Sequence, residues 1–325
     1  MAGKGRICAR IIALGMAIVV SLTGCGEKSD MFTEYKVSVP VDVQSTNSNL
    51  YYVQEYLSHD VCVIPTGRKP DKDSFMTAGA ALLVNKTTNE VLYSQNVYKR
   101  MYPASITKIV TTLMALKYGN MDDDVTISYN ASHITEYGAK LCGFQEGDVI
   151  NLKELLYSFM VCSGNDAGIA IAEHISGSVE GFAKLMNREM AKLGAAGSHF
   201  VNPHGLHDDN HYTTAYDLYL VFNELTKYDM FYDIIGQKYY TANFKGSDGG
   251  KKTLSFGSTN RYKLGTAVAP ENVEVIGGKT GTTMMAGSNL IIISKSKDMD
   301  YISIIMHASD AYSLYDQMNY LLNKI

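Results

Sequence analysis

The 325-residue sequence contains no tryptophan and has no excess of basic residues. Its 29 lysines and arginines are outnumbered by 33 acidic residues, which leaves a formal net charge of −4 at pH 7. A nucleic-acid-binding surface requires a basic excess, so we expect no nucleic-acid partner. The sequence also lacks heptad arrays, solenoid periods and long low-complexity tracts. With 46% hydrophobic and 19% charged residues, it has an ordinary globular composition and is long enough for a sizeable core.

Cysteine is scarce, and its spacing is not that of a metal site. Beyond Cys25 the chain contains only Cys62, Cys142 and Cys162. None of them lies in a C-x-x-C pattern or in a Cys/His spacing suited to zinc, so we expect neither a metal nor a cofactor. Buried free thiols are the default expectation, and a Cys142–Cys162 disulfide is the alternative.

The first 25 residues have the pattern of an export signal. Three basic residues precede an apolar stretch, residues 11–20, which is too short for a comfortable transmembrane helix. The residues Leu22-Thr23-Gly24-Cys25 resemble a bacterial lipobox, which implies that Cys25 is lipidated and becomes the mature N-terminus. A plain cleaved signal peptide is the alternative. We therefore expect a signal peptide over 1–24, a polar tether and lead-in segment over 25–75, and attachment to the outer face of the cell membrane through the lipid.

From about residue 76 the chain alternates between strand and helix patterns. Alternating apolar residues predict strands at Ala78–Val84 and Glu90–Ser94, which a polar turn connects. Further helices are expected at 104–118, 151–161, 167–175, 178–193 and 213–227, then strands at 237–242, 273–281, 288–297 and 300–309, and a last helix at 313–324. This order predicts an α/β (α+β) fold, in which both chain ends form one antiparallel sheet around an inserted helical subdomain. We expect one domain over 76–325, with no further domain after Ile325.

A serine and a lysine, Ser105 and Lys108, stand three positions apart at the head of an apolar helix, in PASITKIV. Residues i and i+3 share one face of a helix. An apolar environment lowers the pKa of a lysine, which can then accept the proton of a neighbouring serine. Extension of the lysine to water is the alternative. A second such pair, Ser294 and Lys297, ends a strand, where residues three apart point to opposite faces, so we do not expect cooperation there.

Two other short motifs place polar residues in apolar surroundings. Ser163-Gly164-Asn165 occupies the break between two apolar helices, where polar side chains can point into a cleft; a helix cap by Asn165 is the alternative. Lys279-Thr280-Gly281 follows an apolar strand, and the glycines on both sides allow a ligand to approach its edge. A lysine there can bind a carboxylate, and the N–H of Thr282 can face an oxyanion. Taken alone, this motif is more often a turn at the end of a strand than a site.

Together and in this order, SxxK, SxN and KTG resemble the motifs of the low-molecular-mass D-alanyl-D-alanine carboxypeptidases, which are penicillin-binding proteins. Longer blocks, such as FAKLMNREMAKLGAAGSHFVNPHGL and GGKTGTTMMAGSNL, look like that family as well, and the resemblance extends from about Ala78 to the C-terminus. It implies a β-lactamase/transpeptidase-like fold. It further implies removal of the terminal D-alanine from peptidoglycan pentapeptide stems through an acyl-enzyme, and covalent inhibition by β-lactam antibiotics.

The resemblance also implies a role for each motif residue. Ser105 would be the nucleophile and Lys108 its base, while Ser163 and Lys279 would complete a proton and charge network. The N–H groups of Ser105 and Thr282 would form the oxyanion hole. The substrate-binding residues would be Asn165, Lys279, Thr280, Gly281 and Thr282.

Two features depart from the family pattern. Relatives often have an arginine after the last strands, suited to the terminal carboxylate of the substrate. A count without gaps from Lys279 puts Leu314 at that position, and no arginine follows Arg261. Many relatives also have a C-terminal β-rich domain before a membrane helix, and the lipid on Cys25 would replace that anchor.

Other functions are less consistent with these residues. A class A β-lactamase usually adds a glutamate motif resembling ExxLN, which does not occur between Asn165 and Lys279. A β-lactam sensor domain, which stays acylated, is normally fused to transmembrane segments. A Ser-His-Asp triad built from His204, His211 and Asp217 is disfavoured, because a lysine base already serves the serine.

Overall fold

The computed structural model describes residues 61–65 and 73–325. The expected signal peptide, Cys25 and most of the expected tether lie outside the described residues.

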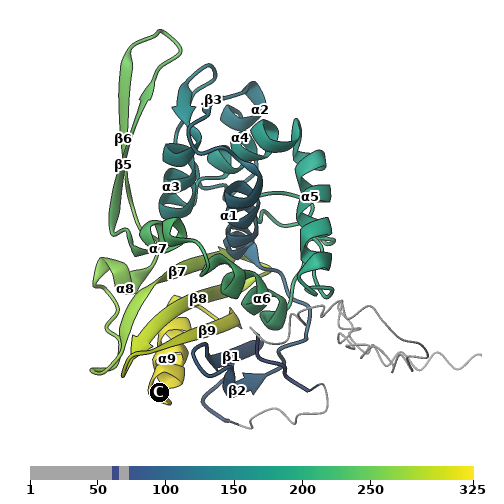
Figure 1. Ribbon diagram of the computed structural model, residues 1–325, viewed down its shortest axis with the longest axis vertical. Helices are drawn as coiled ribbons and strands as arrows, with labels where there is room; N and C mark the ends of the chain where they lie inside the picture. Colours follow the sequence, from purple (N-terminus) through teal and green to yellow (C-terminus); the bar gives the residue numbers. More distant parts are fainter. Residues whose placement is uncertain (1–60, 66–72) are drawn as a thin grey trace, which may run out of the picture. The chain divides into compact units, whose positions relative to one another are not determined.

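A five-stranded antiparallel sheet is formed by segments from both ends of the described chain, in the order β2-β1-β9-β8-β7 (Figure 1). Its first two strands are β1 (Ala80–Asn85) and β2 (Glu90–Gln95). The other three are β7 (Glu274–Thr283), β8 (Gly287–Ser296) and β9 (Met299–Ala308). This arrangement confirms the predicted fold class.

Successive apolar side chains of the central strands point to opposite faces of the sheet, which explains why both faces are covered. In β1, Leu82 and Val84 belong to the larger apolar cluster, which contains the helical block, whereas Ala81 and Leu83 belong to a second cluster with the last helix. Successive side chains of a strand point to opposite faces, so one continuous apolar run packs on two sides. The sheet therefore lies between α9 (Ala311–Leu322) and the helical block (Figure 1).

The helical block lies between the two halves of the sheet in sequence, as predicted. Asn151 caps the helix that begins at Leu152, because its side chain accepts a hydrogen bond from the Lys153 N–H, and Ser178 and Thr214 cap the helices that begin at Val179 and Ala215 in the same way. The helices of this block are α1 (Thr107–Tyr118), α2 (Tyr129–Ser132), α3 (Leu152–Cys162), α4 (Asn165–Ser176), α5 (Val179–Lys192), α6 (Ala215–Leu225) and α7 (Asp229–Gly236). A separate short helix, α8 (Arg261–Leu264), contacts α9 through the hydrogen bond from the Arg261 N–H to the Tyr315 hydroxyl.

A second, four-stranded sheet was not predicted. Its order is β3-β4-β5-β6, and its strands are β3 (Asp124–Thr126), β4 (Val149–Asn151), β5 (Tyr239–Lys245) and β6 (Lys251–Gly257). Only β5 had been expected from the sequence. The first two strands have three residues each, too few for a period-two pattern, and β6 begins with two lysines. The hairpin of β5 and β6 extends beside α3 (Figure 1).

One buried carboxylate holds residues 140–144 against the beginning of α4. Asp166 accepts hydrogen bonds from the backbone N–H groups of Cys142, Gly143 and Phe144, at 2.9, 2.8 and 3.3 Å. The Asn165 N–H donates to the Lys140 carbonyl oxygen at 2.7 Å. This segment is therefore fixed beside the Ser163-Gly164-Asn165 turn, although no local sequence pattern indicates that it lies there.

We predict that Asp166→Ala lowers the free energy of unfolding by roughly 2–4 kcal/mol, because three backbone donors lose a buried charged acceptor. Urea unfolding followed by circular dichroism measures the change. Asp122→Ala, at an exposed aspartate, is the control. Equal urea midpoints for the two variants would contradict this role of Asp166.

Candidate active site

Ser105 lies in a 3₁₀ turn, η2 (Ala104–Ile106), directly before α1, and Lys108 lies in the first turn of that helix. The lysine Nζ is 3.1 Å from the serine Oγ. The Lys108 side chain is fully buried, whereas Ser105 is partly exposed. The structure thus brings the expected pair together, and the alternative in which Lys108 extends to water is wrong.

The surroundings of Lys108 favour its neutral form. Its Nζ donates to Asn165 Oδ1 and to the His204 carbonyl oxygen, both at 2.8 Å. A neutral amine has two N–H groups for these two acceptors and keeps its lone pair for the hydroxyl proton of Ser105. Burial lowers the pKa of Lys108 well below its usual value, and the positive charge of Lys279 adds to this effect. The group is therefore suited to accept a proton from Ser105.

Ser163 ends α3 in the left-handed backbone conformation, with φ of 67°. A non-glycine residue in this conformation is strained, and such strain is concentrated at functional sites. The Ser163 Oγ accepts a hydrogen bond from Lys279 Nζ at 3.0 Å. Asn165 begins α4, and the residue in the N-cap position is Gly164, so the cap alternative for Asn165 is wrong.

Lys279 is directed into the protein, behind the wall of the site. It is 1% exposed, and its Nζ donates to Ser163 Oγ and to the Thr280 carbonyl oxygen, both at 3.0 Å. Burial, followed by the positive charge of Lys140, lowers the pKa of Lys279 to about 7. We expect this lysine both to join Ser163 in a charge network and to bind a substrate carboxylate; in the structure its ammonium is directed at Ser163.

Strand β7 lies directly against the turn that carries Ser105, and this contact requires a glycine. A Cβ atom added to Gly281 would lie 2.7 Å from the Pro103 carbonyl oxygen and 2.8 Å from the Ile106 nitrogen. Because the glycine has no side chain, the backbone of β7 reaches the turn and brings Thr282 beside Ser105. On the same strand, the Thr280 hydroxyl donates to Thr259 Oγ1 at 2.6 Å.

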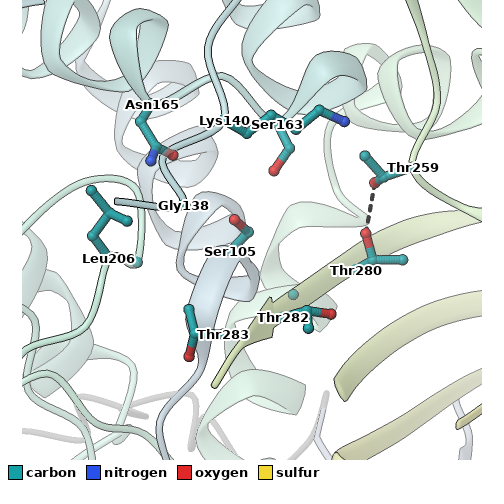
Figure 2. A pocket seen from close by; sticks show the side chains of 12 residues that line it. Ser105, Gly138, Lys140, Ser163, Asn165, Leu206, Thr259, Thr280, Thr282 and Thr283 are labelled. Carbon is teal, nitrogen blue, oxygen red and sulfur yellow. Dashed lines mark hydrogen bonds between the residues drawn. The ribbon is translucent and has the colours of Figure 1, made fainter. Parts of the chain in front are cut away.

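These elements enclose a cavity of about 320 Å³ with the Ser105 hydroxyl at its centre (Figure 2). The sequence motifs predict Ser105, Ser163, Asn165 and β7 at this site, but not the residues contributed by other loops. The lining residues are Ser105, Gly138, Lys140, Ser163, Asn165, Gly205, Leu206, Thr259, Thr280, Gly281, Thr282 and Thr283. Lys140 and Thr259 belong to no motif, so only the fold could reveal them.

The position suggested for a carboxylate-binding arginine lies elsewhere. Leu314 is a buried residue of α9 and packs in the apolar cluster on the other face of the sheet, so the count that placed it at the site was wrong. Arg261 does not replace it. Its guanidinium lies over the rings of Tyr312 and Tyr315, at 5.3 and 5.4 Å from their centroids.

The histidines near the site do not form a triad with Ser105. His211 Nε2 lies 2.7 Å from the hydroxyl of Thr107, and burial lowers the pKa of this imidazole to about 3. The Asp217 carboxylate accepts a hydrogen bond from Ser198 at 2.6 Å. His204 Nδ1 accepts the Leu206 N–H at 3.2 Å, so this ring stabilises its own loop.

The remaining candidates have structural positions. Cys62, Cys142 and Cys162 are free and buried, which confirms the default expectation and not the disulfide alternative. Ser294 is buried in β8, and Lys297 follows the end of that strand, so the second serine–lysine pair is not assembled.

Comparison with known proteins gives the same family as the motifs. The peptidase family S11 model, described as D-alanyl-D-alanine carboxypeptidase, matches residues 67–310. The carboxypeptidase DacF of Bacillus subtilis is 35% identical over 239 residues, covering 71% of this chain and 58% of that protein. DacC of Escherichia coli is 31% identical over 255 residues, covering 75% and 60%.

Solved structures agree with this assignment at the level of the fold. The DD-transpeptidase of Streptomyces K15 superposes with a TM-score of 0.72 at 24% identity, covering 79% of this chain and 98% of that one. The chain spans about three fifths of the length of the curated relatives named above. The family match covers most of the described residues, and the chain belongs to the D-alanyl-D-alanine carboxypeptidase family.

Proposed function

We propose that the protein is a serine-type D-alanyl-D-alanine carboxypeptidase that removes the terminal D-alanine from the pentapeptide stems of peptidoglycan. The observation that carries this proposal is the buried Lys108 amine, 3.1 Å from the Ser105 hydroxyl at the centre of the cavity. The names of the relatives DacF and DacC support the same activity.

In the proposed reaction, neutral Lys108 takes the proton of Ser105 while the serine oxygen attacks the carbonyl carbon between the two D-alanines. The N–H groups of Ser105 and Thr282 stabilise the oxyanion, and the first of them lies at the positive end of α1. The proton then passes to the nitrogen of the departing D-alanine. Water hydrolyses the acyl-enzyme and releases the shortened peptide.

The other motif residues have supporting roles in this mechanism. The hydrogen bond from Lys279 to Ser163 positions a hydroxyl beside the site, through which protons can reach the leaving group. Asn165 holds Lys108 with its side-chain oxygen, which leaves its amide nitrogen for a carbonyl of the peptide. A β-lactam ring opens by the same attack and leaves Ser105 acylated.

We predict that a fluorescent penicillin labels the protein covalently at Ser105 and that the protein releases D-alanine from a pentapeptide ending in D-Ala-D-Ala. Ser105→Ala should lose both activities, because the attacking oxygen is absent. Ser94→Ala, at a buried serine of β2, is the control. An adduct mapped by mass spectrometry to another serine, or persistent labelling of Ser105→Ala, contradicts the assignment.

We predict that Lys108→Arg lowers the acylation rate by at least about a hundredfold, because arginine keeps its charge and cannot serve as the base. The rate is measured with the same penicillin, and circular dichroism checks the fold. Lys117→Arg, near the other end of α1, is the matched control. A Lys108→Arg variant that acylates within a few-fold of the wild-type rate would mean that Lys108 supplies only charge.

We also propose that the enzyme acts outside the cytoplasm, anchored by a lipid on Cys25 after removal of residues 1–24. The lipobox-like residues Leu22-Thr23-Gly24-Cys25 support this proposal. Among the described residues, none of the helices combines the length and apolar character that crossing a bilayer requires.

Expressed in a bacterium, the protein should incorporate a clickable fatty acid and sediment with membranes, and Cys25→Ser should abolish both properties. Cys62→Ser is the control, because this cysteine is buried in the folded protein. Equal incorporation by the wild type and by Cys25→Ser would refute lipidation at this residue.

A further inference from the structure

The cavity around Ser105 contains one unpaired charge that no motif predicts. Among the described residues that line it, Lys140 alone is ionic. Its ammonium makes no hydrogen bond or ion pair with any described residue, and its side chain is exposed. Three other cations of the described chain have partners of their own: Lys108 contacts Asn165, Lys279 contacts Ser163, and Arg261 lies over two tyrosine rings.

The backbone of Lys140 is held in a fixed place relative to the nucleophile. Its carbonyl oxygen accepts the Asn165 N–H at 2.7 Å, and the next residues are bound by the buried Asp166 carboxylate. Asn165 in turn contacts Lys108, which contacts Ser105. A short chain of hydrogen bonds therefore links the lysine on the wall of the cavity to the reacting hydroxyl.

The direction of the Lys140 side chain suits an anion that lies against β7. In Figure 2 it passes beside Ser163 and ends on the side of the cavity where Thr259 and Thr280 lie. The hydroxyl groups of Thr280 and Thr282 line the same wall. Thr280 donates its hydroxyl proton to Thr259, so the hydroxyl protons of Thr259 and Thr282 are those available on this side of the cavity. A cation close to these donors is a suitable arrangement for a carboxylate, which accepts hydrogen bonds on both oxygens.

We propose that Lys140 binds the free carboxylate of the substrate's last residue, together with the hydroxyl groups of Thr259 and Thr282, and so selects peptides with a free C-terminus. This inference rests on the proposed function, because a carboxypeptidase must distinguish a terminal carboxylate from an internal peptide bond. Position 314 is a buried leucine and the guanidinium of Arg261 lies over two tyrosine rings, so neither can bind the carboxylate, and Lys140 takes this role. The lysine ammonium is a point charge and lacks the two parallel N–H groups of a guanidinium, so it attracts the carboxylate without fixing its orientation. The hydrogen bonds from the threonine hydroxyl groups fix that orientation.

The test compares kcat/KM for a diacetyl-lysyl-D-Ala-D-Ala peptide as its free acid and as its C-terminal amide. The wild-type enzyme should prefer the acid. Lys140→Gln should reduce the acid-to-amide ratio by about tenfold or more, which is the usual effect of losing a charge-assisted hydrogen bond. Lys140→Arg should keep the ratio within a few-fold, and Lys153→Gln, at an exposed lysine at the start of α3, should leave it unchanged.

The outcomes separate this inference from the function on which it rests. If wild-type protein neither releases D-alanine nor is labelled by penicillin at Ser105, the proposed function fails and the inference fails with it. If the enzyme is active but Lys140→Gln keeps the acid preference, or if the wild type has none, only the inference is overturned. An equal fall in kcat/KM for acid and amide also overturns it, because Lys140 would then act through the charge of Lys279 and not on the carboxylate.

Discussion

The rest of the site depends on one feature, the burial of the Lys108 amine away from water. An isolated ammonium at a fully buried position is costly, so the group is stabilised either by a partner charge or by losing its proton. Here its two closest partners besides Ser105 are an amide oxygen and a backbone carbonyl, which accept N–H groups but bring no charge. Burial therefore favours the neutral amine, whose free lone pair can accept the proton of the Ser105 hydroxyl.

Keeping water away from this amine requires three distant segments to meet. Segment 202–206 supplies the carbonyl of His204, the break between α3 and α4 supplies Asn165, and β7 lies against the turn that carries Ser105. Glycine at position 281 permits the last of these contacts, because any side chain would strike the turn that carries Ser105. The sheet and the helical block are therefore joined at the place where the chemistry is proposed.

The positive charges of the site influence one another. The charge of Lys279 lowers the pKa of Lys108, and the charge of Lys140 lowers that of Lys279. No carboxylate lines the cavity among the described residues. If Lys140 binds an anionic substrate group as proposed, that group would reduce this mutual repulsion, and recognition of a carboxylate would be coupled to the protonation states of the two buried lysines.

The strands of the central sheet, most of the larger helices and the pairing of Ser105 with Lys108 can be predicted from the amino-acid sequence. These features depend on short-range periodicity, which is two residues for strands and three to four residues for helices. The sequence by itself did not determine the second sheet, whose strands β3 and β4 are too short to have a period. Nor did it determine the inward direction of Lys279, the burial of Leu314 or the arrival of Lys140 at the cavity. Those depend on contacts between residues far apart in the chain, such as Lys279 with Ser163 and Leu314 with the far face of the sheet, and such contacts exist only once the two ends of the chain and the helical block have packed together.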